Sequence, residues 1–217
     1  MLIVFEGVDA SGKATQSERV FEYLKTKYDT RKISFPDYDS PSSALVKMYL
    51  AGEFGEKPED VSPYAASAFY AVDRYASFKK DWGGFLSAGG TLVADRYVTS
   101  NMIHQAAKIK DTAEKDKYLH WIYDFEYEKL GLPKPDKVIF LDMPPQFARE
   151  LMRERANKIT GEAEKDIHEK DAEYLERAYE NAVYVAEKAG WERIICAKDS
   201  VRSIEDITNE IIERIGL

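Results

Sequence analysis

Gly7-Val8-Asp9-Ala10-Ser11-Gly12-Lys13 is the stretch of sequence that decides the fold. The apolar run Leu2 to Phe5 precedes it, and a helical pattern follows it at Ser17, Val20, Phe21 and Leu24. A strand, a glycine-bounded loop, a lysine and a helix in this order make a loop whose N–H groups cradle phosphate oxygens. The N-terminus of the following helix adds partial positive charge. The sequence therefore predicts a phosphate-binding loop of the P-loop type.

The atoms expected to hold a nucleoside triphosphate come from the loop and from the start of the helix, namely from Gly7, Val8, Asp9, Ala10, Ser11, Gly12, Lys13, Ala14 and Thr15. Lys13 supplies a charge to the β- and γ-phosphates, and the residue after it is usually Ser or Thr, whose hydroxyl binds Mg²⁺. Here that residue is Ala14. Either another group or water fills the metal position, or the loop binds nucleotide without catalysis.

Four further short apolar segments look like strands, and helical patterns separate them. The expected strands are Leu2 to Phe5, Arg31 to Phe35, Thr91 to Ala94, Lys137 to Leu141 and Arg193 to Cys196. One helix is expected to begin at Pro63 with Ser62 as its cap, because Pro is favoured at the first helical position. Strands that alternate with helices predict an α/β fold with a parallel sheet of about five strands, flanked by helices.

Composition limits the classes of function. The chain has 217 residues, which predicts one domain over 1–217, and its formal net charge of −8 disfavours nucleic acid and membrane surfaces as partners. No apolar stretch reaches the length of a membrane span, and no secretory signal is apparent. Cys196 is the only cysteine, so a reducing cytoplasm is the expected location.

Two acids and an arginine are expected beside the phosphate loop. Asp95-Arg96 follows the strand Thr91 to Ala94, and ligands of parallel sheets bind at the carboxyl ends of strands. Asp9 lies inside the loop, where a carboxylate close to phosphates needs a metal, an arginine or a substrate hydroxyl as partner. Asp9 and Asp95 are therefore candidate Mg²⁺-binding residues, and Arg96 is a candidate phosphate ligand. The alternative is a surface Asp–Arg pair and a loop-capping Asp.

Two other sets of residues could contact substrates. Tyr70 and Arg74 share one face of a helix, so the ring could stack on a base and the guanidinium could reach a base edge, although such aromatics more often belong to the core. Arg149, Arg153 and Arg155 lie in a charged segment, approximately 146–170, that could be a lid closing over transferring phosphate. A solvated helix face explains the same arginines.

Taken together, these motifs resemble the thymidylate kinase family of P-loop nucleoside monophosphate kinases. The resemblance covers most of the chain. It rests on Phe5-Glu-Gly-Val-Asp9, the phosphate loop, Phe35-Pro36, Tyr70 to Arg74, Asp95-Arg96-Tyr97, Gly131-Leu-Pro-Lys-Pro-Asp136, Leu141-Asp142 and Tyr179-Glu180. The activity that it implies is ATP + dTMP → ADP + dTDP, with Mg²⁺, in dTTP biosynthesis. It also implies a homodimer.

The resemblance assigns roles residue by residue. Asp9 and Arg96 would hold the acceptor phosphate with Asp95 nearby, and Lys13 would hold the phosphates of ATP. The family places a catalytic arginine either at the position of Ala10 or in the lid, so the resemblance implies Arg153 or Arg155. The remaining acceptor-site residues would be Phe35 and Tyr38 as lining, Tyr70 stacked on thymine, Arg74 at the base edge, Ser100 and Asn101 at the base or sugar, and His104 near the ribose 2′ position.

Two rivals remain open from the residues alone. One is another P-loop kinase, for a deoxynucleoside or a different monophosphate, which would share the loop and differ in the acceptor site. The other is a nucleotide-binding module without catalysis, for which Ala14 is the support.

Overall fold

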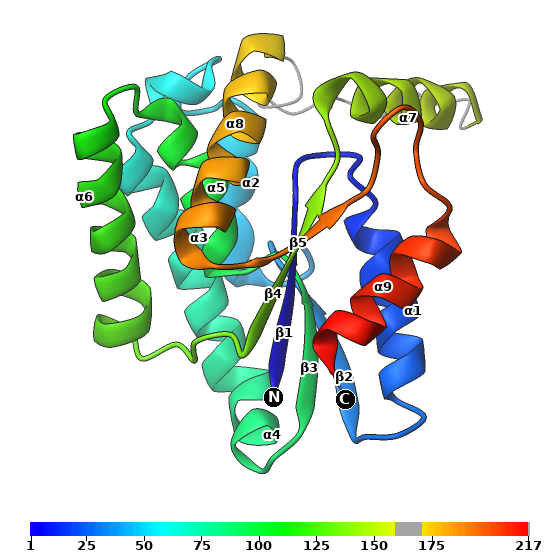
Figure 1. The fold of residues 1–217 in the computed structure, drawn as a ribbon. Coiled ribbons are helices and arrows are strands. Elements are labelled where there is room, and N and C mark those ends of the chain that lie inside the picture. Colours follow the sequence, from blue (N-terminus) through cyan, green and yellow to red (C-terminus); the bar gives the residue numbers. More distant parts are fainter. Residues whose placement is uncertain (159–170, 217) are drawn as a thin grey trace.

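A five-stranded parallel sheet forms the centre of the computed structural model, which describes residues 1–158 and 171–216 (Figure 1). The strands are β1 (Leu2–Glu6), β2 (Thr30–Ser34), β3 (Thr91–Asp95), β4 (Lys137–Asp142) and β5 (Glu192–Ile195). Their spatial order is β2-β3-β1-β4-β5, and every neighbouring pair is parallel. The fold is the predicted P-loop nucleoside monophosphate kinase fold, and each predicted strand is correct to within one residue at each end.

Helices connect the strands and cover the sheet. The α-helices are α1 (Lys13–Leu24), α2 (Ala44–Leu50), α3 (Pro63–Ser77), α4 (Gly83–Ser87), α5 (Val98–His104), α6 (Thr112–Tyr123), α7 (Pro145–Lys158), α8 (Ala172–Ala189) and α9 (Ile204–Ile215). Short 3-10 helices are η1 (Pro41–Ser43), η2 (Pro58–Asp60) and η4 (Ala106–Lys108), and π-helical turns are η3 (Phe78–Trp82) and η5 (Asp124–Lys129).

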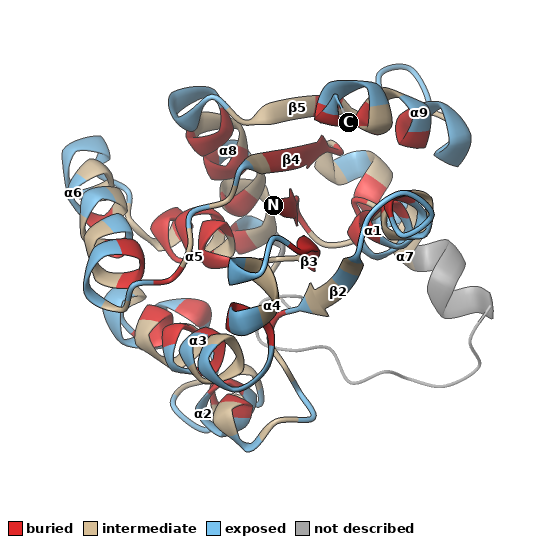
Figure 2. Cartoon of the chain, turned by 90° about the horizontal axis from the view of Figure 1, so that it is seen from below, coloured by how far each residue is buried: buried red, intermediate tan, exposed pale blue. Residues whose placement is uncertain are grey.

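The sheet is buried on both faces because successive side chains of a strand point to opposite sides. Leu2 and Val4 of β1 pack in a core with residues of α5 and α6, whereas Ile3 and Phe5 pack in a second core with α1 and α9. Figure 2 shows the buried strands between these helical layers. In the described part of the chain no helix is long and apolar enough to cross a membrane.

Helix α3 begins as predicted, but its apolar stripe, which consists of Ala65, Ala68, Phe69, Val72 and Ala76, does not all face the core. The hydroxyl of Ser62 accepts a hydrogen bond from the N–H of Ala65 at 3.2 Å, and Pro63 is the first helical residue. The inward face buries Ser67, Asp73 and Arg74 together with two alanines. Val72, by contrast, is 52% exposed. The helix therefore buries polar side chains and leaves part of its apolar face open.

Candidate functional site

The phosphate loop lies at the carboxyl end of β1, and its shape requires glycine at two positions. A Cβ at Gly7, where φ is 155°, would stand 2.9 Å from the carbonyl oxygen of Leu141 and 2.5 Å from the hydroxyl oxygen of Ser11. Gly12 has φ 90° at the N-cap of α1, a conformation that costs other residues strain. The predicted strand, loop and helix are thus present, and the loop packs against the end of β4.

Lys13 is folded back over its own loop. Its Nζ donates to the carbonyl oxygens of Gly7 at 2.9 Å and Val8 at 2.8 Å, and the side chain is buried. Burial, together with the charge of Arg96, lowers the pKa of Lys13 to about 8. The ammonium is therefore held at the mouth of the loop. Because its pKa is lowered there, the negative charge of an incoming polyphosphate would raise that pKa and stabilise the charged form.

Arg96 joins the end of β3 to the phosphate loop. Its Nη2 donates to Oδ1 of Asp9 at 2.6 Å, and its Nη1 lies 2.8 Å from Nε2 of His104. Because a guanidinium only donates, Nε2 of His104 is the acceptor and that ring is neutral. Arg96 has φ 69°, in the left-handed region that non-glycine residues seldom adopt. Of the kinds of partner expected for Asp9, the structure thus supplies an arginine, Arg96, whose own backbone is strained.

Glu6 supports this strained turn, a role that was not predicted from the sequence. It is fully buried, and its carboxylate accepts from the N–H of Tyr97 at 3.1 Å and the hydroxyl of Thr99 at 2.6 Å. The hydroxyl of Ser100 donates to the same carboxylate at 2.8 Å. Burial raises the pKa of Glu6. Glu6 therefore fixes the residues that follow Arg96, and the Ser100 hydroxyl is engaged with it.

A cavity of about 220 Å³ opens beside Asp9 and Arg96. It brings together all the predicted acceptor-site residues except Asp95. Its lining consists of Asp9, Phe35, Pro36, Tyr38, Leu50, Tyr70, Arg74, Arg96, Tyr97, Ser100, Asn101, His104 and Gln105. Gln105 was not predicted, and its buried Oε1 has no hydrogen-bond partner among the described residues. The cavity lining thus combines the Asp9–Arg96 ion pair beside the loop with aromatic and amide side chains.

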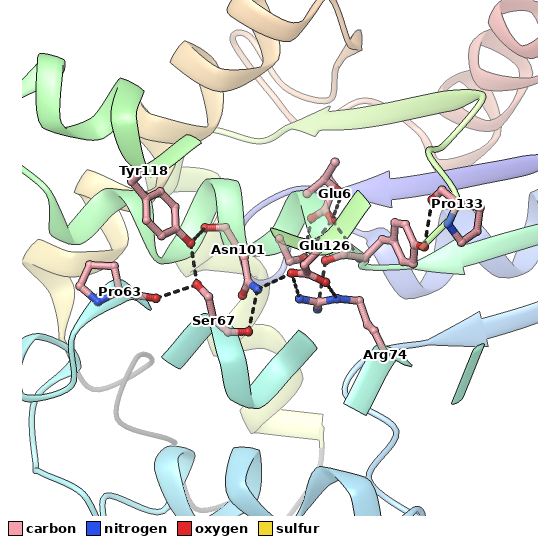
Figure 3. A network of polar contacts seen from close by, with 11 residues as sticks. Glu6, Pro63, Ser67, Arg74, Asn101, Tyr118, Glu126 and Pro133 are labelled. Carbon is pink, nitrogen blue, oxygen red and sulfur yellow. Dashed lines mark hydrogen bonds and ion pairs between the residues drawn. The ribbon is translucent and has the colours of Figure 1, made fainter. Parts of the chain in front are cut away.

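Arg74 reaches this cavity from a buried ion pair with Glu126 (Figure 3). Its Nε lies 2.7 Å from Oε2 and its Nη2 lies 2.5 Å from Oε1 of Glu126, and the exposed fractions of the two side chains are 1% and 0%. The amide nitrogen of Asn101 donates to the same carboxylate at 3.1 Å. Glu126 was missed, although one signal was present: it is an acid that directly follows an apolar stripe at helical spacing, formed by Tyr118, Trp121, Ile122 and Phe125.

The acids near the loop suit a Mg²⁺ ion that is bound mainly by a nucleotide, and they do not form a site in which the protein supplies every ligand. The structure as described contains no group of three His, Cys, Asp or Glu side chains that could hold an ion. Mg²⁺ bound to a nucleotide needs only one or two carboxylates, because phosphates and water supply its other ligands. Burial and Arg96 lower the pKa of Lys13, whereas the negative charges of Asp9 and Asp95 raise it. Both acids are therefore within electrostatic reach of the loop and fit that role.

The proposed lid is only partly described. Arg149 on α7 donates to Glu176 of α8 at 2.6 Å, and both side chains are about half exposed. Arg153 and Arg155 also belong to α7, but their side chains, like residues 159–170, lie outside the described part of the structure. The prediction that a lid arginine acts in catalysis therefore stays a prediction.

Known proteins resemble this chain in sequence and in fold. The family model described as thymidylate kinase matches residues 5–211. A thymidylate kinase from Mycobacterium tuberculosis is 34% identical over 88% of this chain and 87% of that protein. A probable thymidylate kinase from Thermococcus onnurineus is 29% identical over 98% of this chain and 95% of that protein.

Fold comparison agrees with the sequence matches. The crystal structure of thymidylate kinase from Ehrlichia chaffeensis superposes with a TM-score of 0.67, at 20% identity, and the match covers 99% of this chain and 98% of that one. This likeness concerns the arrangement of the sheet and helices. With the family match over nearly its whole length and the geometry of the loop and cavity, the chain belongs to the thymidylate kinase family, a family of phosphotransferases.

Proposed function

We propose that the protein transfers the γ-phosphoryl group of ATP to dTMP, giving ADP and dTDP with Mg²⁺, as a step toward dTTP. One observation carries this proposal. The cavity of about 220 Å³ is lined both by the Asp9–Arg96 pair beside the phosphate loop and by Arg74 and Asn101, the two side chains that Glu126 contacts. A nucleoside monophosphate placed there would direct its phosphate at the loop and its base at the amide and guanidinium.

Each residue of the loop and of the strand ends has a distinct part in this proposal. The N–H groups of the loop and the ammonium of Lys13 bind the ATP phosphates, and Lys13 exchanges two backbone carbonyls for phosphate oxygens. Arg96 and Asp9 hold the acceptor phosphate. Asp9 and Asp95 are the acids that would hold Mg²⁺, which would neutralise charge on the β- and γ-phosphates. Catalysis then comes mainly from positioning and charge neutralisation.

The role of the lid in this proposal rests on the sequence, because the side chains of its arginines lie outside the described part of the structure. Arg153 or Arg155 would neutralise the charge that develops on the transferring phosphoryl group, because Ala10 offers no cation in the loop. These two arginines are two positions apart, so on a regular helix they point about 200° apart and only one would face the phosphates. We favour Arg153. The expected cytoplasmic location is likewise a prediction from the sequence.

The experiment that tests the activity compares acceptors. ADP release is measured with ATP and Mg²⁺ and with dTMP, dUMP, dCMP, dGMP, UMP or thymidine in separate reactions. The proposal predicts the largest kcat/KM with dTMP. A larger kcat/KM with thymidine would assign the protein to the nucleoside kinases, and ADP release independent of every acceptor would contradict a monophosphate kinase.

The pH dependence of ATP use should report Lys13. In the free enzyme the pKa of Lys13 is lowered to about 8 by burial and by Arg96, so raising the pH above that value removes the cation that binds the phosphates. We expect kcat/KM for ATP to fall above about pH 8, by at most about tenfold per pH unit. In kcat the same decline should begin at higher pH, because bound phosphates favour the ammonium. A kcat/KM profile that stays flat for about two pH units above pH 8 would contradict this assignment.

Ala14 offers a direct test of metal binding. Ala14→Ser introduces the hydroxyl that usually binds Mg²⁺ at this position, with little added volume, and residue 14 is exposed at the start of α1. We expect half-saturation at a lower Mg²⁺ concentration, measured by the initial rate at fixed ATP. An unchanged Mg²⁺ curve would mean that Asp9, Asp95 or water already complete the coordination.

The homodimer implied by the family resemblance has a candidate interface on α3. Val72 and Tyr75 on this helix are 52% and 39% exposed, and Tyr64 at its start is 41% exposed. A two-fold interface would cover the same patch on both copies. We expect Val72→Asp to shift the molecular mass from dimer to monomer in size-exclusion chromatography with light scattering. Val201→Asp, at an exposed position outside α3, is the control and should leave the mass unchanged. A wild-type mass of one chain at all concentrations would exclude the dimer.

A further inference from the structure

Glu126 contacts two residues at the base end of the cavity, and it does so from a fully buried position (Figure 3). Its carboxylate accepts two hydrogen bonds from Arg74, at 2.7 and 2.5 Å, and one from the amide nitrogen of Asn101, at 3.1 Å. The three residues come from η5, α3 and α5. One carboxylate therefore sets the orientation of both side chains that are expected to meet the base.

The orientation of the Asn101 amide follows from the chemistry of its partners. A carboxylate paired with a guanidinium only accepts, so Asn101 turns its NH₂ group toward Glu126. The carbonyl oxygen of Ser67, 3.4 Å from the same nitrogen, is also an acceptor. The Oδ1 atom is thus on the opposite side of the amide, where no described residue donates to it. Because Asn101 lines the cavity, this acceptor is available to a ligand there.

Arg74 supplies donors beside that acceptor. A guanidinium carries five N–H groups. Glu126 takes two of them, and the carbonyl oxygen of Tyr97 takes a third at 3.4 Å. Arg74 lines the cavity, as Asn101 does, so its remaining N–H groups are the donors that it can offer to a ligand there. The cavity lining therefore offers an acceptor next to a donor, in an order fixed by Glu126.

We propose that Glu126 is a positioning residue that makes the site select a 4-keto pyrimidine over a 4-amino pyrimidine. This inference rests on the proposed function, because it takes a pyrimidine monophosphate as the ligand. Thymine presents an N3–H donor beside an O4 acceptor, which matches Oδ1 of Asn101 and the N–H groups of Arg74. A 4-amino pyrimidine presents the reverse order and would leave buried polar groups unpaired at both atoms.

The test compares dTMP with 5-methyl-dCMP, which has the same methyl group, sugar and phosphate and differs only at N3 and C4. Dissociation constants come from isothermal titration calorimetry, and kcat/KM is measured in parallel. The wild type should bind dTMP about 10- to 100-fold more tightly than 5-methyl-dCMP. Absence of turnover with dTMP would count against the proposed function, whereas equal affinities for the two ligands would overturn the role of Glu126.

Three variants show whether the base preference depends on the order of donor and acceptor set by Glu126 or on the packing of the surrounding network. Glu126→Gln keeps the size but adds a donor, so the Asn101 amide can reverse, and the preference for dTMP should fall by about tenfold or more. Glu126→Asp keeps an acceptor-only group, so it should weaken dTMP binding and retain the preference. Tyr118→Phe removes a hydroxyl that contacts Ser67 and the backbone of Asn101 in the same network, and it should retain the preference too.

Any of the following results would overturn the proposal. Glu126→Gln could bind with the wild-type preference, which would mean that the order of donor and acceptor does not depend on the carboxylate. Glu126→Asp or Tyr118→Phe could lose the preference, which would assign it to packing of the network. If Glu126→Gln does not fold, the wild-type and Glu126→Asp measurements decide on their own, because the proposal fixes the outcome of each.

Discussion

Replacing Lys13 with methionine should lower kcat for dTMP phosphorylation by about 10² to 10³ or more, the effect of removing one preorganised donor from a transition state. Lys13 is the cation of the phosphate loop, and its Nζ already stands at that loop through the carbonyls of Gly7 and Val8. The fold should persist, because burial lowers the pKa of Lys13 to about 8 and so already disfavours the ammonium in the folded protein.

The measurement needs a control for folding and for position. Circular dichroism and the Tm should show that Lys13→Met is folded, and a steady-state assay gives kcat. Lys25→Met, at the C-cap of the same helix and paired with Glu22 at the surface, should have wild-type kcat. Wild-type turnover by folded Lys13→Met would remove the loop from the mechanism.

Arg74→Ala should destabilise the protein by about 3 to 5 kcal/mol, because it leaves the carboxylate of Glu126 buried without its cation. The same change should raise the KM for dTMP far more than the KM for ATP, since Arg74 lines the acceptor cavity. Chemical denaturation measures the first effect, and initial rates at a temperature where the variant is folded measure the second. If only the KM for ATP changed, the assignment of the dTMP site to this cavity would be wrong.

Two controls show whether burial causes the effect on stability. Arg149→Ala breaks the Arg149–Glu176 pair, whose side chains are 48% and 47% exposed, and it should cost less than about 1 kcal/mol. The double variant Arg74→Met, Glu126→Leu removes both buried charges, so most of the lost stability should return. It should still bind dTMP poorly. Equal losses in Arg74→Ala and Arg149→Ala would contradict the burial argument.

The sequence was sufficient for those features that local patterns encode. The strands and the phosphate loop are short-range signals, in which apolar runs and glycine spacing determine the conformation directly. The N-terminus of α3 is another, because Ser62 and Pro63 satisfy and shape the first helical turn within four residues. The prediction of a dTMP-phosphorylating kinase of the P-loop class is confirmed at the level of the family, which does not favour the rival functions.

The parts that were missed depend on partners far apart in the chain. Glu126 contacts Arg74 across 52 residues, so neither residue alone indicates a buried ion pair. The burial of Arg74 could not be predicted from the sequence, because the apolar stripe of α3 indicated that the opposite face of the helix would face the core. Glu6 belongs to a recognisable motif, but its contact with Tyr97 and Thr99 exists only because β1 and β3 are neighbours in the sheet.

Transfer of a labelled γ-phosphoryl group is the most direct measurement of the central claim. The protein is incubated with dTMP, Mg²⁺ and ATP that carries the label only in its γ-phosphoryl group, and the nucleotides are separated by chromatography. The account predicts that the label appears in dTDP in step with ADP formation, and that Lys13→Met lowers the rates of both together. Label that appears only in inorganic phosphate, or ADP formation without dTDP, would contradict it.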